Sequence, residues 1–224
     1  MRRFLLPALL VLLAPSAPLG AQSLEDYDYE NLEFRGVGLE LAHLWPARVE
    51  PTLAFGIRAD LGFLGPQVRI VPRASFWSSQ LRGEQVDELR ENLLGLCRDD
   101  GTDCLAELGE IRVSDLTLGA DAHYTFQTDL VATPYAGLGA SLHLLNGRGD
   151  LINGTFVEDL LDAIAPGVEL VGGVELPLGG ALRLFGEARG TLSSDVRYLG
   201  VSAGGSWLFP AGPAPRTPAR GGPR

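Results

Sequence analysis

The sequence predicts an all-β protein, an eight-stranded antiparallel up-and-down barrel. Apolar and polar residues alternate with a period of two, the period of a β-strand, in eight separate runs. Residues typical of turns, chiefly Gly, Pro, Asn and Asp, lie between the runs, and no long helical pattern competes with them. The predicted strands are 34–45, 52–63, 68–77, 113–126, 130–144, 167–176, 181–191 and 196–209.

The N-terminus has the three parts of a secretory signal peptide. Arg2 and Arg3 precede an apolar run over residues 4–13, and small residues follow up to Ala21. The apolar run is too short to span a bilayer, and three prolines before Ala21 argue against a buried helix. We expect cleavage after Ala21. The segments are then a signal peptide, 1–21, a periplasmic lead, 22–33, the barrel, 34–209, and a tail, 210–224.

The mature chain is predicted to be acidic. Removing Arg2 and Arg3 from the 18 basic residues leaves 16 against 28 acidic ones, so the formal charge falls from −10 to −12. The chain has no lysine, and its arginines are scattered through the predicted strands. Because they form no basic patch, we expect no nucleic-acid partner.

The chain has two cysteines, Cys97 and Cys104, in a polar stretch. An exported protein meets an oxidising compartment, so we expect a disulfide between them that closes a small loop. Two cysteines without neighbouring histidines make a poor metal site. The sequence suggests neither a metal ion nor a cofactor.

The two faces of the predicted strands differ in chemistry. One face carries residues such as Leu39, Ile57 and Leu138, with no Asp, Glu or Arg along the middle of the strands. The opposite face is rich in glycine and combines acids with arginines. Its charged residues are Glu40, Arg58, Asp60, Arg69, Arg73, Asp115, Asp121, Glu169, Glu175, Arg183, Glu187 and Arg189.

This distribution predicts a barrel that crosses a membrane. A soluble barrel buries its apolar residues and exposes its charges, whereas this chain has a broad apolar face. The polar face suits the crowded interior of a narrow barrel. The runs reach the roughly 9 to 11 residues that a tilted strand needs to cross a bilayer. We expect the charged residues to pair and plug the lumen, Arg58 and Asp60 among them because they lie two apart on one strand.

The lengths of the connections predict the orientation. Short links at 64–67, 127–129 and 177–180 alternate with long insertions at 78–112 and 145–166. If both ends of the barrel lie in the periplasm, an even number of strands puts these short links there and both insertions outside. Aromatic residues then form two girdles, an outer one of Trp45, Phe76 and Trp77 and an inner one of Phe34, Phe63, Tyr124, Phe126, Trp207 and Phe209.

Each long insertion contains a helical pattern. In the first, Val86 and Leu89 begin a series of apolar residues spaced by three and four, and in the second Phe156, Leu160 and Ile164 do the same. We predict a short helix in each insertion. The helices either form a surface for a partner at the outer mouth or pack on each other to order the loops.

The last predicted strand ends with Ser202, Gly204, Trp207 and Phe209, which places aromatics at its last and third-last positions. This pattern, and the architecture of residues 34–209, resemble the small eight-stranded outer-membrane β-barrel family, which includes OmpA-like transmembrane domains, OmpX-like and opacity-type proteins. The resemblance implies a bacterial outer-membrane location, contact with its lipid, and recognition of these four residues by the insertion machinery. Family members often stop at the terminal aromatic. This chain continues with a Pro-, Gly- and Arg-rich tail that we expect to be disordered.

The histidines suggest no catalytic motif. His43 lies near the rim of the first strand without a nearby serine, and His123 and His143 face inward toward opposite ends of their strands. We therefore expect a barrel without catalytic residues, in a structural or surface-interaction role. The alternatives are a channel or transporter for small solutes, which the inward glycines favour, and a lipid-modifying barrel enzyme.

Overall fold

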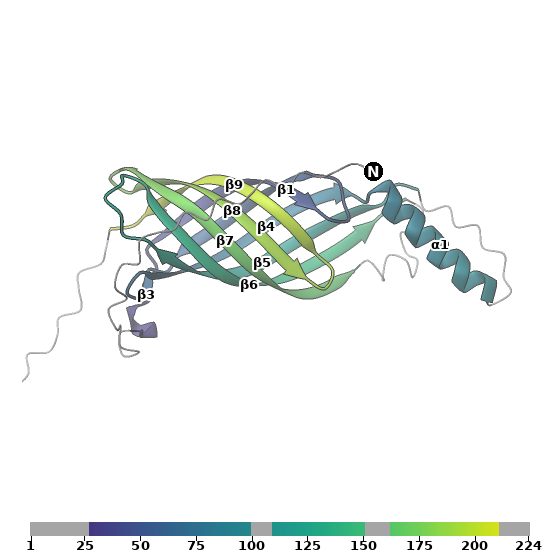
Figure 1. The fold of residues 1–224 in the computed structure, drawn as a ribbon, viewed down its shortest axis with the longest axis horizontal. Coiled ribbons are helices and arrows are strands. Elements are labelled where there is room, and N and C mark those ends of the chain that lie inside the picture. The colour runs from purple at the N-terminus through teal and green to yellow at the C-terminus, as the bar shows by residue number, and fades with distance from the viewer. Residues whose placement is uncertain (1–26, 100–108, 151–161, 211–224) are drawn as a thin grey trace, which may run out of the picture.

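The computed structural model describes residues 27–99, 109–150 and 162–210. Within these ranges the chain forms a closed antiparallel barrel and one α-helix, α1 (Gly83–Asp99) (Figure 1). The predictions that lie outside the described residues are the signal peptide, the tail, the helix at Phe156 and Leu160, and the disulfide, whose Cys104 is not described.

Eight antiparallel strands close the barrel, which confirms the predicted fold class. The ladder runs β2-β1-β9-β8-β7-β6-β5-β4, and pairing of β2 with β4 closes the ring. One strand is interrupted and is therefore divided into β2 and β3. The strands are β1 (Gly36–Pro46), β2 (Thr52–Asp60), β3 (Phe63–Gly65), β4 (Val68–Gln80), β5 (Arg112–Thr125), β6 (Thr133–Arg148), β7 (Ala163–Gly179), β8 (Leu182–Ser193) and β9 (Arg197–Leu208).

Leu61 and Gly62 interrupt the second strand. Gly62 has a φ of 74°, in the left-handed region that favours glycine, and its N–H donates to Oδ1 of Asp60 at 2.8 Å. The N–H of Leu61 donates to the carbonyl of Ile70, and the N–H of Ile70 donates to the carbonyl of Gly62, both at 3.0 Å. Because these bonds bridge the break, the interruption is a local irregularity and the barrel stays closed.

Three strands extend further than the sequence predicts toward the end of the barrel that carries α1, which we call the α1 end. β4 continues to Gln80, β6 continues to Arg148, and β7 already begins at Ala163. The second insertion is therefore shorter than the predicted 145–166, and Ile164 lies in β7, not in a loop helix. The added ends of β4 and β6 place polar residues on the outward face and the added start of β7 is apolar on both faces, so the alternation that marks the strands fades there.

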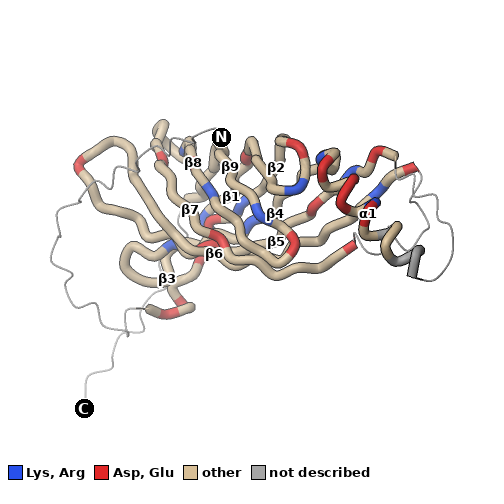
Figure 2. The backbone as a smooth tube through the Cα atoms, turned by 45° about the vertical axis from the view of Figure 1, so that its right-hand side comes forward, with Lys and Arg blue, Asp and Glu red and all other residues tan. Residues whose placement is uncertain are grey.

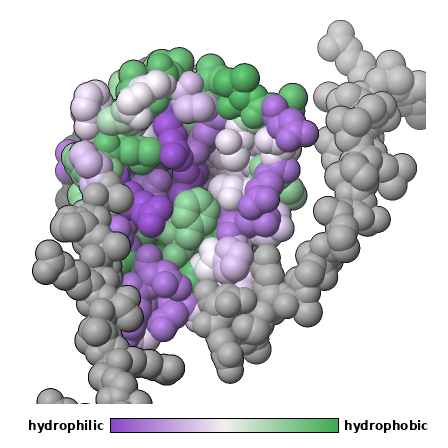
Figure 3. Space-filling view, turned by 90° about the vertical axis from the view of Figure 1, so that its left-hand side faces the viewer, coloured by the Kyte–Doolittle hydropathy of each residue, from purple (hydrophilic) through white to green (hydrophobic). Residues whose placement is uncertain are grey.

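The outside of the barrel is apolar and its inside is charged. Leu39 and Leu138 are 69% and 68% exposed, whereas Asp115 is completely buried. Acidic and basic positions lie close together along the strands in the middle of the barrel (Figure 2). A view onto the end away from α1 shows hydrophilic side chains in the centre and hydrophobic ones along much of the edge (Figure 3). This is the arrangement that the period of two predicts.

The described chain begins and ends at the same end of the barrel, opposite α1 (Figure 1). At that end, the short 3-10 helix η2 (Tyr29–Asn31) lies against β3. The N–H of Asp28 donates to the carbonyl of Leu64 at 3.0 Å, and Nδ2 of Asn31 donates to the same carbonyl at 3.4 Å. In the described ranges, α1 included, no helix has the length and apolar character of a membrane span.

Candidate functional site: the lumen of the barrel

The structure brings the predicted lumen residues together. Eleven of the twelve have an ion-pair partner inside the barrel, and Asp115 is hydrogen-bonded to His143. The sequence could not tell which residue pairs with which. The ion pairs are Arg58 with Glu40 and Glu187, Arg69 with Asp60 and Glu175, Arg73 with Asp121 and Glu169, Arg183 with Glu175, and Arg189 with Asp121, Glu169 and Glu187.

Arg189 is the residue with most partners in this network. Its Nη2 lies 2.8 Å from Oδ2 of Asp121 and 2.6 Å from Oε1 of Glu187, and its Nη1 pairs with Glu169. Arg73 pairs with the same Glu169, and its Nε lies 3.6 Å from Oδ2 of Asp121. The two arginines and three acids come from β4, β5, β7 and β8, so this cluster crosses the bore.

Glu187 connects that cluster to Arg58. Nη2 of Arg58 lies 2.5 Å from Oε2 of Glu40 and 3.3 Å from Oε2 of Glu187. The Tyr135 hydroxyl donates to the same oxygen of Glu187 at 2.7 Å. The guanidinium of Arg58 also lies 3.6 Å from the centroid of the Phe185 ring, a cation–π contact. Seven strands, β1, β2, β4, β5, β6, β7 and β8, therefore contribute to one continuous polar core.

Glu175 anchors a further cluster, toward the end opposite α1. It accepts two hydrogen bonds from Arg69, one of them at 2.8 Å, and Nη1 of Arg183 lies 3.4 Å from its Oε2. Asp60 lies 3.6 Å from Nη1 of Arg69. We expected Arg58 and Asp60 to share a network because of their spacing. Both face the lumen, but they belong to different clusters: Arg58 pairs with Glu40, and Asp60 pairs with Arg69.

Toward the α1 end, the polar core ends in a hydrogen-bonded chain that the sequence analysis missed. Nδ1 of His143 lies 2.8 Å from Oδ2 of Asp115, and Oγ of Ser141 lies 3.1 Å from Nε2 of His143. Thr117 donates to Asp115 at 3.1 Å. The signal was present in the spacing, because Ser141 and His143 lie two apart on β6 and therefore share a face. Chemically, a serine–histidine–aspartate chain can activate a nucleophile.

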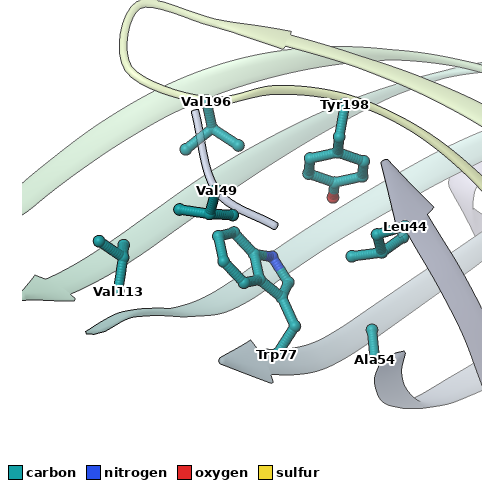
Figure 4. Close-up of a cluster of buried hydrophobic side chains, with 7 residues drawn as sticks. All are labelled: Leu44, Val49, Ala54, Trp77, Val113, Val196 and Tyr198. Carbon is teal, nitrogen blue, oxygen red and sulfur yellow. The ribbon is translucent and has the colours of Figure 1, made fainter. Parts of the chain in front are cut away.

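A cluster of buried apolar side chains, which we call the apolar cap, covers the core at the α1 end (Figure 4). Trp77 lies in it and is 3% exposed, with its Nε1 donating to Oδ2 of Asp115 at 3.1 Å. The prediction that Trp77 belongs to the outer girdle is therefore wrong. Phe76 and Trp77 are consecutive, so only one of them can face outward. The cap consists of Leu44, Val49, Ala54, Trp77, Val113, Val196 and Tyr198.

Inward glycines leave space that neighbouring side chains occupy. A Cβ on Gly56 would lie 2.6 Å from Oε1 of Glu40, and one on Gly173 would lie 2.6 Å from the Tyr135 hydroxyl. These distances are shorter than any normal contact, so a larger residue at either position would displace the core. These inward glycines make room for the side chains of the polar core.

The other two histidines lie apart from each other. His43 faces outward, with its ring 4.6 Å from that of Trp45. His123 is completely buried and stacks on Tyr135 at 4.6 Å. Within residues 27–99, 109–150 and 162–210, no group of three His, Cys, Asp or Glu side chains is arranged to hold a metal ion.

The four residues of the predicted assembly signal lie on or directly after the closing strand β9. Trp207 and Phe209 are exposed on the outside, and the Phe209 ring lies 5.5 Å from that of Phe34. Ser202 and Gly204 lie on the inward face, where Gly204 touches the Phe185 ring. Their recognition by insertion machinery stays a prediction.

A closed eight-stranded barrel with an apolar exterior and a charged, paired interior is the fold of the small outer-membrane β-barrels. The chain is similar to Neisserial surface protein A, with 16% identity over 78% of this chain and 97% of that chain and a TM-score of 0.54. It is also similar to the outer membrane protein OprG from Pseudomonas aeruginosa, with 13% identity over 81% and 98% of the two chains and a TM-score of 0.49. At this identity the likeness concerns the fold. No protein-family model and no curated protein matches the sequence.

Proposed function

We propose that the protein is an outer-membrane barrel with a closed lumen, that it has a structural or surface-interaction role, and that it is not an enzyme. The observation that carries the proposal is the polar core, in which shared carboxylates join the arginines of neighbouring clusters across the bore. An eight-stranded barrel is just wide enough for side chains to fill its interior. Paired charges that occupy this space leave no room for a solute path.

The outside of the barrel supports the membrane location. Large apolar side chains cover it, and Phe55 and Leu170 are 66% and 65% exposed. In water, a contiguous apolar surface of this kind would drive aggregation, whereas in a bilayer it is the surface that lipid requires. Both ends of the described chain lie opposite α1, which supports a periplasmic position for them and an outer position for α1.

The small size of two cavities in the wall and lumen supports closure. One cavity, beside Arg73 and Arg189, has a volume of about 20 Å³, and another, beside Arg58 and Arg69, about 10 Å³. A water molecule needs roughly 10–15 Å³, so each cavity has room for about one. The apolar cap adds a second barrier at the α1 end, because a dry apolar constriction opposes the passage of ions.

Planar-bilayer recording tests the closed lumen. We expect the purified barrel to be nearly silent, and Arg58→Ala to produce conducting events because it removes the arginine that pairs with Glu40, leaves Glu187 with Arg189 alone, and opens a cavity beside them. Arg112→Ala, which removes an exposed arginine at the α1 end, is the control and should stay silent. Stable, large conductance from the unmodified protein would favour the small-solute channel and contradict our proposal.

The lipid-modifying enzyme has one observation in its favour, the chain of Ser141, His143 and Asp115. These residues face the lumen, and His143 and Asp115 are completely buried. Of the cavities described above, neither is lined by Ser141. Ser141 is itself buried, at 8% exposed, on the inward face of the wall, away from the acyl chains of the surrounding membrane. We assign these three hydrogen-bonded residues a structural role: they give the buried Asp115 a partner and link β5 to β6.

The outer segments are the candidates for a surface interaction. The helix α1 projects from its end of the barrel, away from the strands (Figure 1). Its residue Leu94 is 36% exposed. A projecting helix of this kind can present a surface to a partner, while the barrel serves as its anchor.

Assembly of the barrel is expected to depend on the aromatic end of β9. Replacing Trp207 and Phe209 together by Ala should reduce the amount of folded barrel in the membrane, because both lie on the outer face of the closing strand. Gel mobility before and after boiling measures the folded fraction, since a folded barrel resists detergent. Deleting the tail, residues 210–224, is the control and should have little effect. A deletion more harmful than the double substitution would show that the assembly signal lies in the tail.

A further inference from the structure

The outer wall of the barrel contains an apolar groove near the α1 end. It has a volume of about 490 Å³ and lies across β6, β7, β8, β9 and the end of β1, which are neighbours in the sheet. Its apolar walls include Leu170, Leu192 and Leu199. With strands about 4.8 Å apart, five strands make a groove on the order of 20 Å across. This is a shape that suits an extended hydrocarbon chain.

The groove exists because one outward position on β8 has no side chain. Gly190 pairs with Leu170 on one side and with Leu199 on the other. A Cβ at Gly190 would have its nearest neighbour, Cδ2 of Leu199, at 3.5 Å, an ordinary contact. No steric demand of the barrel therefore requires glycine at this position, and a larger residue would simply fill the groove.

A cation lies at the outer end of this groove. Arg197 is exposed, lines the groove, and follows the same outward alternation as Leu199. Among the described residues, its side chain has no ion pair or hydrogen bond. Arg48 is close by, because the N–H of Ala47 donates to the carbonyl of Arg197 at 2.9 Å. Trp45 lines the same end of the groove and is 46% exposed, as expected of a tryptophan at a membrane interface.

Two acids lie in the same region. Glu169 lines the groove, but its carboxylate pairs with Arg73 and Arg189 in the lumen. Asp195, two residues before Arg197, does not line the groove; it lines a cavity of about 110 Å³ at the mouth of the barrel that Arg197 also lines, and among the described residues no ion pair joins the two. Its carboxylate accepts a hydrogen bond from Oγ of Ser194 at 2.6 Å. The groove itself therefore combines an apolar floor with a free arginine above it, on a chain that is otherwise strongly acidic.

We propose that this groove binds a phosphorylated glycolipid of the outer leaflet, with an acyl chain against Gly190 and a phosphate on Arg197. The proposal rests on the membrane location proposed above. A guanidinium matches phosphate in geometry as well as charge, and each arginine near an anionic membrane surface adds to lipid attachment. The position of the groove, at the end that carries α1, selects the outer leaflet and hence its glycolipid.

A second groove on the same wall provides an internal comparison. It has a volume of about 670 Å³ and lies toward the opposite end, with Val37, Leu182, Gly205 and Trp207 among its lining residues. Arg58 and Arg73 also border it, but their guanidinium groups pair with carboxylates in the lumen. This groove can hold an acyl chain, but among the residues that line it there is no arginine without a carboxylate partner.

Native mass spectrometry of the full-length barrel in detergent micelles can test the proposal with lipid A as the probe. Dephosphorylated lipid A and phosphatidylglycerol are the comparison lipids. We expect the unmodified protein to retain lipid A in preference to both. Arg197→Gln should weaken retention about fivefold, the effect expected for one arginine at an anionic surface, and Gly190→Leu should abolish it by filling the groove.

Two control variants separate this site from general attraction. Gly205→Leu makes the same substitution in the other groove, where the nearest atoms to a Cβ lie 3.7 Å away, and Arg112→Gln removes another exposed arginine at the α1 end. Both should bind lipid A like the unmodified protein. Heat-dependent gel mobility shows whether each variant is folded.

Three outcomes would overturn the proposal: equal retention of phosphatidylglycerol, equal retention of dephosphorylated lipid A, or equal losses in the control variants. A different result would contradict the proposed membrane location. If the protein were recovered outside the membrane fraction, the membrane location itself would be wrong. If the barrel were recovered in the membrane but did not retain lipid A, only the glycolipid site would be contradicted.

Discussion

Replacing Arg189 by Ala is expected to lower the free energy of unfolding by about 3–5 kcal/mol, the usual cost of leaving buried charges without their partner. Arg189 pairs with Asp121, Glu169 and Glu187, and its side chain is 10% exposed. Its removal leaves Arg73 to compensate Asp121 and Glu169. Urea-induced unfolding of the barrel in lipid vesicles, followed by tryptophan fluorescence, measures the change.

Arg183→Ala is the matched control for Arg189→Ala. Arg183 lies on the same strand and also pairs with a carboxylate, but at 3.4 Å and with 39% of its side chain exposed. An exposed pair of this kind contributes about 0–1 kcal/mol. If the two substitutions destabilised the barrel equally, burial of the network would not be what makes Arg189 important.

Gly204→Ala is expected to destabilise the barrel by about 3 kcal/mol, at the upper end of the range for overpacking. A Cβ at this position would overlap the carbonyl oxygen of Leu39 on β1 and lie 2.8 Å from Cε1 of Phe185. The Phe185 ring cannot retreat freely, because the guanidinium of Arg58 lies on it. The contact also lies where β9 meets β1, so the substitution strains the closure of the ring.

The neighbouring residue provides the control for Gly204→Ala. A Cβ on Gly205 would have its nearest neighbours at 3.7 Å, on the outside of the barrel. Gly205→Ala should change stability by no more than about 0.5 kcal/mol, as surface substitutions usually do. The folded fraction of both variants can be compared by heat-dependent gel mobility. Equal behaviour of the two would mean that the barrel can absorb a methyl group on its inner wall.

The faces of the strands could be predicted because a strand alternates strictly between two sides. Charged residues such as Arg73 and Glu169 share one side, and the structure places them inside. The same rule, applied to Phe76 and Trp77 together, would have excluded one of them from the girdle. The outward position of Arg197 could also be predicted, because it follows the alternation of β9. Its proposed role could not, because that role depends on a groove formed by strands distant in sequence.

Features that depend on pairing across strands could not be predicted from the sequence. The partners of Arg58 come from β1 and β8, and only the register of the closed sheet brings them together. The contact between Ser141, His143 and Asp115 likewise depends on how β5 meets β6. The break at Gly62 carries no distinct signal, because glycine is frequent on the inward faces of several other strands, β1, β6 and β9 among them.

The polar core also has a consequence for the cell that makes this protein. An open pore limits how many copies a membrane can hold, because each copy adds to the leakage of ions and nutrients. On the proposed closure, a barrel whose bore is occupied by its own arginines and carboxylates adds none. Its abundance is then limited by synthesis and by membrane area, so the cell can display its outer segments at high density without loss of the permeability barrier.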